Sequence, residues 1–596
     1  MIQYLLEDLL QDNPTIAGLL QEADTPNRAR NFLKAYLDEF SRLLFKESHR
    51  DSSLAWSQQV TCFLAFQEII SLRSERISRF SIIKRLWQAI HKQENSSDEP
   101  LSEAFYTDLG HILAGMTGKS TIYSMKELPA FLGMQGQEAA IARSADLDWL
   151  AAHTLDATNR YPHGLQPEIM EKRARNRAHI LEQLSGGESD WADYHWHLKH
   201  LIRDSTVLGR LIDLIPEECA AIDQARAARL PFGITPYYAS LMDREGHRLD
   251  DHAVRAQVIP PPFYVHTMLQ HQNDRVVYFD FMRETDTSPV ELITRRYPHI
   301  AIFKPYNTCS QICVYCQRNW EIEDVLFPEA LAPPEKIDRA ISWLEEHRAI
   351  TEVLLTGGDP LVMSDRVLAG LLERLAAVDH IERIRIGSRI FVALPQRMTD
   401  DLADLISRHH QPGRREMALV THFEHPYEMT PEAMEAVQKM RRRGISVYNQ
   451  AVYTMENSRR FELVALRRLL RLIGVDAYYT FCAKGKDETR DYRVPIARLQ
   501  QEVKEEARLM PGLVRTDEPV YNVPKLGKNY LRAEQNHSLL TIMPNGGRLY
   551  EFHPWEKNLT MAPTWLHKDI PILDYLRELE RRGENPEEYR SIWYYF

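Results

Sequence analysis

The chain has 596 residues, enough for two to four domains, and 44% of them are hydrophobic, as in ordinary soluble globular proteins. Its formal net charge of -11 gives no electrostatic reason to expect a nucleic acid or a membrane as partner. No run of about eighteen apolar residues occurs, and the first residues lack the basic region and cleavage site of a signal peptide. We therefore expect a cytoplasmic protein.

The first third of the chain is predicted to be helical. Apolar residues recur at spacings of three and four in segments 31–40 and 80–90, which is the pattern of amphipathic helices. No repeat or chemical motif occurs before residue 185. We expect residues 1–185 to form a helical N-terminal region, whose role the sequence does not reveal.

From about Ile300 onwards, short apolar strands alternate with helices of about ten to fifteen residues. The expected strands are 301–303, 352–355, 383–387, 417–420, 445–448 and 477–481. This alternation predicts an α/β fold with a parallel sheet, in the form of a full or partial (β/α) barrel. In such barrels the chemistry lies at the C-terminal ends of the strands, where the motifs described next occur.

Three of the six cysteines, Cys309, Cys313 and Cys316, form a C-x3-C-x2-C cluster directly after the first of these strands. Such clustering indicates metal or redox chemistry in a reducing compartment rather than a disulfide framework. A structural zinc ion needs four ligands, and Cys482 is the only later cysteine. An iron–sulfur cluster held by three thiolates keeps one iron open to another ligand. We favour a [4Fe-4S] cluster, with zinc as the alternative.

The cysteine spacing resembles the signature of radical S-adenosylmethionine (SAM) enzymes. In that superfamily the open iron chelates SAM, whose cleavage yields a 5′-deoxyadenosyl radical. Gly357, Gly358 and Asp359 follow the next expected strand and resemble the superfamily motif that contacts the methionine amino group. Alone, a Gly-Gly pair would indicate only a tight turn. His422 and Gln450 are further candidate SAM contacts, although each could equally be a polar residue that fills a strand end.

A longer series of motifs resembles lysine 2,3-aminomutase and its relatives over roughly residues 186–555. The motifs are Arg296-Tyr-Pro, the cysteine loop and segments 354–361, 385–389, 394–397, 421–426 and 449–450. The resemblance implies a radical SAM barrel with a helical N-terminal extension. It divides the chain into residues 1–185, a family-specific segment 186–295 that packs on the barrel, the barrel at 296–500, and a C-terminal segment 501–596.

The resemblance implies pyridoxal 5′-phosphate (PLP) as a second cofactor, held by a lysine of the C-terminal segment. Lys528 is the best match for that lysine and Lys525 is the runner-up. Phe481 is expected to pack on the PLP ring, and Arg296 to lie near the PLP phosphate. A second family arginine near the phosphate is Ile300 here, so phosphate binding must differ in detail.

Substrate binding is where the chain departs from lysine 2,3-aminomutase. Arg318 matches the family arginine that pairs with the substrate carboxylate, which a guanidinium can hold bidentately. Lys484 and Asn522 align with two aspartates that hold the distal ammonium of lysine. A lysine and an asparagine suit a distal carboxylate and resemble the glutamate 2,3-aminomutase branch. Alternatively, the local alignment is off and Lys484 faces solvent.

We expect an isomerase: a radical SAM, PLP-dependent 2,3-aminomutase that converts an L-α-amino acid, glutamate in preference to lysine, into a β-amino acid. Two alternatives remain within the same cofactor chemistry, namely a lysine 2,3-aminomutase and an enzyme acting on a modified amino acid in a biosynthetic pathway. A scaffold that kept only the fold is disfavoured by the intact cysteines and Lys528. The resemblance also implies an electron donor, such as flavodoxin or ferredoxin, and a possible homo-oligomer.

Overall fold

The computed structural model describes residues 5–47, 54–93, 97–123, 129–244, 250–482, 487–533, 537–554 and 559–596. Contacts between residues divide the chain into two compact units. The first unit comprises Met1–His153, Val494–Glu506 and Ala533–Phe596, and the second comprises Thr154–Arg493 and Ala507–Arg532. This division differs from the four segments that the motifs imply, because it joins the two ends of the chain in one unit. Within the described ranges, no helix is long and apolar enough to cross a membrane.

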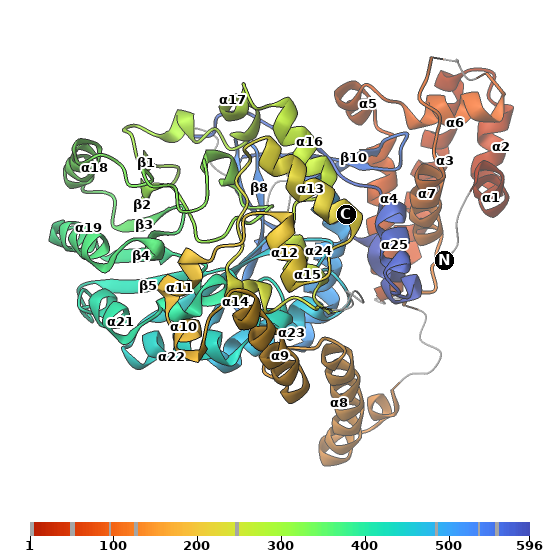
Figure 1. Ribbon diagram of the computed structural model, residues 1–596. Coiled ribbons are helices and arrows are strands. Elements are labelled where there is room, and N and C mark those ends of the chain that lie inside the picture. The colour runs from red at the N-terminus through yellow and green to blue at the C-terminus, as the bar shows by residue number, and fades with distance from the viewer. Residues whose placement is uncertain are drawn as a thin grey trace. The chain divides into compact units, whose positions relative to one another are not determined.

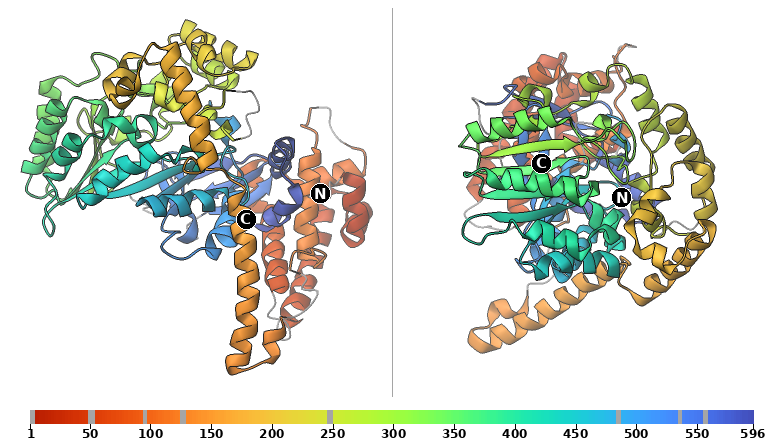
Figure 2. Two further views of the ribbon diagram at one scale, coloured as in Figure 1. Left: turned by 60° about the horizontal axis from the view of Figure 1, so that its bottom comes forward. Right: turned by 60° about the vertical axis from the view of Figure 1, so that its left-hand side comes forward.

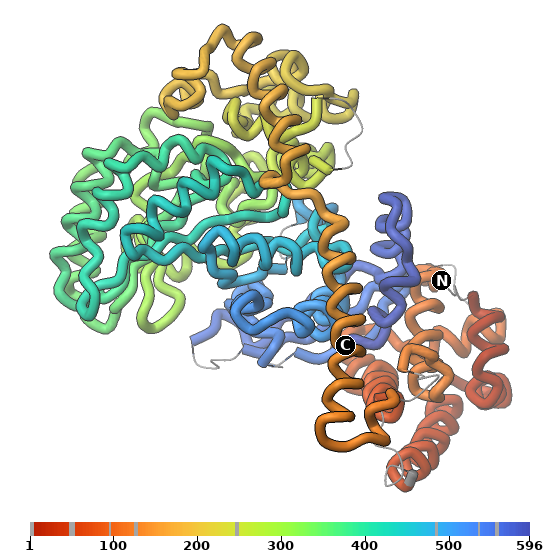
Figure 3. Tube along the Cα trace, turned by 90° about the horizontal axis from the view of Figure 1, so that it is seen from below, coloured from red at the N-terminus to blue at the C-terminus, as the bar shows by residue number. Residues whose placement is uncertain are grey.

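The first unit packs N-terminal helices against C-terminal segments, as Figure 3 shows where blue chain runs beside red and orange chain. Its helices are α1 (Leu6–Asp12), α2 (Pro14–Glu22), α3 (Pro26–Glu47), α4 (Leu54–Ile69), α5 (Leu72–Ser78), α6 (Ile82–Ile90), α7 (Glu103–Met116), α24 (Ile496–Gln501) and α25 (Ile572–Arg581). Its antiparallel sheet comprises β10 (His537–Ile542), β11 (Arg548–Phe552) and β12 (Trp565–Lys568). A buried ion pair between Arg548 and Asp108, 2.7 Å apart, joins the sheet to α7.

The second unit is built around one sheet of nine strands in chain order. The strands are β1 (Ile293–Thr294), β2 (Ile300–Tyr306), β3 (Glu352–Gly357), β4 (Arg383–Gly387), β5 (Glu416–Thr421), β6 (Ser446–Tyr453), β7 (Asp476–Cys482), β8 (Glu518–Val523) and β9 (Gly527–Tyr530). Strands β2 to β8 pair in parallel, whereas β1 and β9 are antiparallel to their neighbours.

The helices between the parallel strands cover one face of this sheet (Figures 1 and 2). They are α18 (Pro334–Glu346), α19 (Asp365–Ala377), α21 (Asp400–Ser407), α22 (Pro431–Arg442) and α23 (Glu462–Ile473). Because neighbouring strands follow one another in the chain, right-handed crossovers place every helix on the same face. The opposite face is left for side chains from the strands and for the cysteine loop, which is the arrangement of a partial (β/α) barrel.

A helical segment precedes the barrel and contacts it. It contains α9 (Pro167–Gln183), α10 (Glu188–Ala192), α11 (Tyr194–Lys199), α12 (Ser205–Leu211), α13 (Pro216–Ala227), α14 (Pro236–Ala239), α15 (His252–Ala256), α16 (Pro262–Gln270) and α17 (Arg275–Phe279). In α9, Arg173 donates to the carbonyl of Tyr427 and Asn176 donates to the carbonyl of Met242 at 2.9 Å. Thus α9, which lies before residue 185, belongs to the second unit.

The predicted α/β fold is confirmed. The six expected strands correspond to β2 through β7, and the strand ends that carry the motifs lie on one edge of the sheet. The sequence analysis did not identify β1, β8 or β9. The first of these is only two residues long, and the other two form a hairpin that interrupts the strand–helix alternation.

Candidate active site

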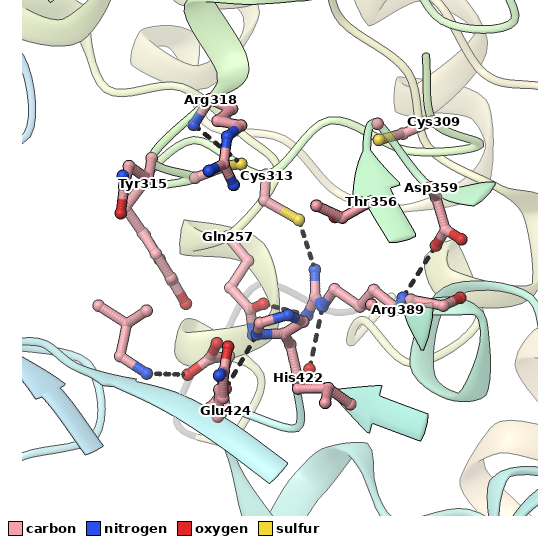
Figure 4. A pocket seen from close by; sticks show the side chains of 18 of the residues that line it. Gln257, Cys309, Cys313, Tyr315, Arg318, Thr356, Asp359, Arg389, His422 and Glu424 are labelled. Atoms are coloured by element: carbon pink, nitrogen blue, oxygen red, sulfur yellow. Dashed lines mark hydrogen bonds between the residues drawn. The ribbon is translucent and has the colours of Figure 1, made fainter. Parts of the chain in front are cut away.

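A cavity of about 280 Å³ lies where the cysteine loop meets the C-terminal ends of β3 to β8 (Figure 4). Eleven of the residues singled out in the sequence line it: Cys309, Cys313, Cys316, Arg318, Gly357, Gly358, Asp359, His422, Gln450, Phe481 and Asn522. Lys528 and Arg296 are not among its lining residues. Lys484 lies outside the described residues.

The three clustered cysteines are free thiols on the loop that follows β2. The Sγ of Cys313 accepts a hydrogen bond from Arg389 at 2.9 Å, and the Sγ of Cys316 accepts one from the backbone N–H of Arg318 at 3.4 Å. Burial raises the pKa of Cys309, and it raises the pKa of Cys313 to about 11. Binding of a metal would release the thiol protons and form metal–sulfur bonds in their place. The three cysteines therefore have the chemistry of a metal-ligating triad.

The glycine pair brings the end of β3 against the start of the cysteine loop. The N–H of Gly358 donates to the carbonyl of Tyr306 and the N–H of Asp359 donates to the carbonyl of Thr308, both at 2.8 Å. A Cβ on Gly358 would lie 2.1 Å from the carbonyl oxygen of Thr308. Gly357 has φ +115°, a conformation that residues with side chains rarely adopt. Both positions therefore require glycine.

Gly358→Ala is expected to impair assembly of the cysteine site. The added methyl group must push the backbone at Thr308 away, and overpacking of this kind costs about 1–3 kcal/mol. Iron bound per chain after anaerobic reconstitution measures the effect. Gly370→Ala is the matched control, because a Cβ there meets no atom within 4 Å and Gly370 lies within α19. Normal iron content in Gly358→Ala would contradict this account.

Arg389 connects most of the polar groups on this side of the cavity, and the sequence analysis assigned it no role. Its guanidinium donates to Cys313 Sγ, to the carbonyl of His422 at 3.2 Å and to Glu428 at 2.7 Å, while its backbone N–H donates to Asp359 Oδ2 at 2.8 Å (Figure 4). It also donates to Gln257. Its place directly after β4, within a motif already noted, was the available signal.

Glu424 is a second residue in the cavity that the sequence analysis did not single out. It is buried, and its Oε2 accepts a hydrogen bond from the backbone N–H of Val452 at 2.6 Å (Figure 4). Burial raises its pKa to about 8, and the nearby charge of Glu428 adds to this effect. At neutral pH this side chain is therefore largely a neutral carboxylic acid beside His422 and Gln450.

His422 is held as a neutral imidazole. Its Nδ1 lies 3.0 Å from the carbonyl oxygen of Gln450, and burial together with the positive charge of Arg389 lowers its pKa to about 4. Because a carbonyl only accepts, Nδ1 carries the proton and Nε2 is left as an acceptor.

Lys528 lies on β9 among aromatic rings. Its Nζ is 3.8 Å from the ring centre of Tyr479, 5.7 Å from that of Tyr297 and 5.8 Å from that of Phe481. Burial lowers the pKa of Lys528 to about 7, and the positive charges of Arg385 and Arg296 contribute. The lowered pKa makes the unprotonated amine, which is the form that reacts with aldehydes, accessible near neutral pH.

Arg318 has a protein carboxylate as its partner in this structure. Its Nη2 and Nε donate to the two oxygens of Glu284, at 2.8 and 3.2 Å. Lys304 donates to the same carboxylate at 3.2 Å. Although burial alone would raise the pKa of Glu284, the charges of Arg318 and Lys304 lower it to about 2. Within the described part of the chain, no side chain or carbonyl accepts from the Nη1 of Arg318, which lines the cavity.

Comparisons with known proteins agree with this geometry. Residues 303–465 match the model of the radical SAM superfamily. The chain is 42% identical to the uncharacterized KamA family protein MJ0634 of Methanocaldococcus jannaschii, across 99% of this chain and 97% of that protein. It is 31% identical to glutamate 2,3-aminomutase of Clostridioides difficile, across 60% of this chain and 80% of the other, and 32% identical to L-lysine 2,3-aminomutase of Bacillus subtilis, across 52% and 62%.

The cysteine triad at the end of the first parallel strand, together with the superfamily match, defines a radical SAM enzyme, as expected. Within that superfamily the chain belongs to the KamA family. Its named relatives are aminomutases, which are isomerases. The lysine 2,3-aminomutases among them use a [4Fe-4S] cluster, SAM and PLP. The similarity to MJ0634 includes residues 1–185, which the aminomutase motifs leave unmatched.

The residues present fit these cofactors. Three thiols line one cavity, burial raises the pKa of two of them, Cys309 and Cys313, and the glycine pair lets the end of β3 approach the backbone at the start of the cysteine loop. A buried amine of lowered pKa lies against aromatic rings near two guanidinium groups, which suits an aromatic aldehyde that carries a phosphate.

Proposed function

We propose that the protein is a PLP-dependent amino acid 2,3-aminomutase that converts an L-α-amino acid into its β-isomer. The observation that carries the proposal is the cavity that combines three thiols, the glycine pair and Arg318, with the reactive amine of Lys528 close to its Phe481 wall. The named relatives that match this chain are aminomutases acting on glutamate and lysine.

Each cofactor has a candidate set of residues in this proposal. Cys309, Cys313 and Cys316 would hold the cluster, and Gly357, Gly358, His422 and Gln450 would contact SAM. Lys528 would hold PLP, with Phe481 against its ring. Arg296 and Arg385 are the candidates for binding the phosphate of PLP, because the charges of both act on Lys528. Arg385 would take the place of the second family arginine, whose position is Ile300 in this chain.

When bound, these groups supply a radical that removes a β-hydrogen and a carrier for the migrating nitrogen. A cluster held by the three cysteines would need one electron from a donor, for which a flavodoxin or ferredoxin is suitable. The protein's own contribution is mainly positioning and exclusion of water. Arg318 would orient the substrate carboxylate, Lys528 would hold PLP through its amine, and Phe481 and Tyr479 would keep water from that amine.

For the substrate, we propose an amino acid whose side chain ends in a carboxylate or a neutral polar group, with glutamate ahead of lysine. Asn522 lines the cavity and donates to Gln317, the chain neighbour of Arg318, and an amide does not neutralise an ammonium as a carboxylate does. The alignment of Lys484 with the first family aspartate supports the same preference, although that residue lies outside the described part of the chain.

The direct test is turnover of single amino acids. Reconstituted protein, SAM and reductant are incubated with L-glutamate, L-glutamine, L-aspartate or L-lysine, and β-isomers are separated by chromatography. We expect isomerisation of L-glutamate that depends on SAM and on PLP. Turnover of lysine without glutamate would overturn the substrate assignment and keep the reaction. Isomerisation without PLP would overturn the proposed mechanism.

A second candidate is a radical SAM enzyme that acts on a modified or carrier-linked amino acid. The first unit favours it, because the match to glutamate 2,3-aminomutase covers only 60% of this chain. Deleting residues 1–185 is not a clean test, because this removes α9 and its contacts within the second unit. Efficient turnover of free glutamate by the full chain would count against this candidate.

A further inference from the structure

Gln317 links two residues of the proposed substrate site. Its Nε2 donates to Glu284 at 3.1 Å, and its Oε1 accepts a hydrogen bond from Asn522 Nδ2 at 3.3 Å. Gln317 and Asn522 both line the cavity beside Arg318. The side chain therefore connects the carboxylate partner of Arg318 with the residue proposed to face the far end of the substrate.

The direction of these hydrogen bonds is fixed by Glu284. This carboxylate stays ionised, because the charges of Arg318 and Lys304 hold its pKa near 2. An ionised carboxylate only accepts hydrogen bonds, so the group of Gln317 that faces it must be the NH₂ group. The two ends of an amide are otherwise nearly indistinguishable in shape, and here chemistry settles which end is which. The oxygen of Gln317 consequently points to Asn522.

The same reasoning orients Asn522. Since Gln317 presents an oxygen, the NH₂ group of Asn522 must face it, and one of its two N–H groups donates to that oxygen. Asn522 keeps its Oδ1 and one N–H for a ligand. Among the described residues, Gln317 is the one side-chain hydrogen-bond partner of this amide. The amide of Asn522 therefore offers a ligand one acceptor and one donor, rather than two donors.

We propose that Gln317 determines specificity by making this end of the cavity accept a side-chain carboxamide, so that L-glutamine competes with L-glutamate as substrate. The inference rests on the proposed function, because it concerns the substrate of the same site. A carboxamide can donate to Oδ1 of Asn522 and accept from its N–H. A carboxylate can only accept, and its lone pairs face those of Oδ1.

The test compares two substrates of nearly equal shape. The ratio of kcat/KM for L-glutamate to that for L-glutamine is measured in the full-length enzyme and in Gln317→Met, which keeps the volume and removes both hydrogen bonds. Asn522 is then free to turn its NH₂ group toward a carboxylate. We expect the ratio to rise about fivefold or more, which is the factor expected of one hydrogen bond. Binding of the α-carboxylate by Arg318 is common to both substrates and cancels.

Three further variants isolate the cause. Gln317→Asn keeps an amide but is one methylene too short to reach both partners, so we expect the same shift from it. In an Asn522→Ala background, Gln317→Met should leave the ratio unchanged, because Gln317 acts through Asn522. Gln411→Met, on an exposed loop of the same unit, should have no effect.

A ratio that stays within twofold in both Gln317 variants overturns the proposal, and so does an equal shift in the Asn522→Ala background. If wild type isomerises neither amino acid, the proposed function fails by itself. The same ratio, taken from dissociation constants in equilibrium dialysis with the two labelled amino acids, then decides on Gln317.

Discussion

Lys528→Ala is expected to abolish both covalent attachment of PLP and turnover of every amino acid tested, whereas Lys525→Ala keeps both. The amine of Lys528 is buried against Tyr479, with a pKa lowered to about 7 from an ordinary value of 10.5. A lysine that loses its proton in this range reacts with an aldehyde near neutral pH. Both lysines follow the same motif, so the pair also separates the best sequence match from the runner-up.

Trapping the bound aldehyde with borohydride and mapping the modified peptide measures this directly. Because the lowered pKa makes the amine unprotonated above about pH 7, the rate of trapping at Lys528 should rise through pH 7 and level off well below pH 10. A rate that keeps rising toward pH 10 would show an ordinary, hydrated amine. Modification at Lys525 in place of Lys528 would reverse the assignment of the two lysines.

The barrel could be predicted because its signals are local. Each strand–helix pair of the barrel has a local sequence pattern, namely a short apolar strand followed by an amphipathic helix, and six strands were identified from this pattern. The joining of the two chain ends in the first unit has no local signal. It depends on contacts between residues hundreds of positions apart, such as the buried pair of Arg548 and Asp108.

In the candidate active site, too, residues with a local sequence signal could be predicted and residues without one could not. Residues that directly follow a strand, such as Gly358 and His422, were placed at the cavity from the sequence, since parallel strands end at a common edge. Glu284 lies in an irregular segment after α17, where neither spacing nor residue type marks it. That it pairs with Arg318 and orients Gln317 emerges only from the fold.

Arg389→Met is expected to destabilise the second unit and to prevent stable cluster binding. Glu428 is fully buried, and the guanidinium of Arg389 is its ion-pair partner at 2.7 Å. Removing one member of a buried pair leaves an uncompensated charge, at a cost of about 3–5 kcal/mol. The same change removes the donor to Cys313 Sγ, so that one thiolate of the triad loses its hydrogen bond.

Thermal unfolding of the full chain and iron bound after anaerobic reconstitution measure the two effects separately. Arg383→Met is the matched control at the start of β4, the strand that Arg389 follows, because that arginine is 46% exposed and its ion pairs with Glu352 and Glu416 are worth about 0–1 kcal/mol at such exposure. The thermal unfolding midpoint and the iron content of Arg383→Met should stay near those of wild type. An Arg389→Met midpoint equal to that of the control would show that the buried network does not depend on this arginine.

A double variant identifies how much of the lost thermal stability and iron binding comes from the uncompensated charge of Glu428. In Arg389→Met combined with Glu428→Gln, no carboxylate is left uncompensated, so much of the thermal stability should return. The hydrogen bond to Cys313 stays absent, and iron binding should therefore remain weak. Recovery of iron binding along with stability would mean that Arg389 supports the cluster only through the fold. Stability restored without iron would instead place Arg389 in the cluster site itself, because its guanidinium donates to Cys313 Sγ while its backbone N–H, which the variant keeps, donates to Asp359 of the glycine motif.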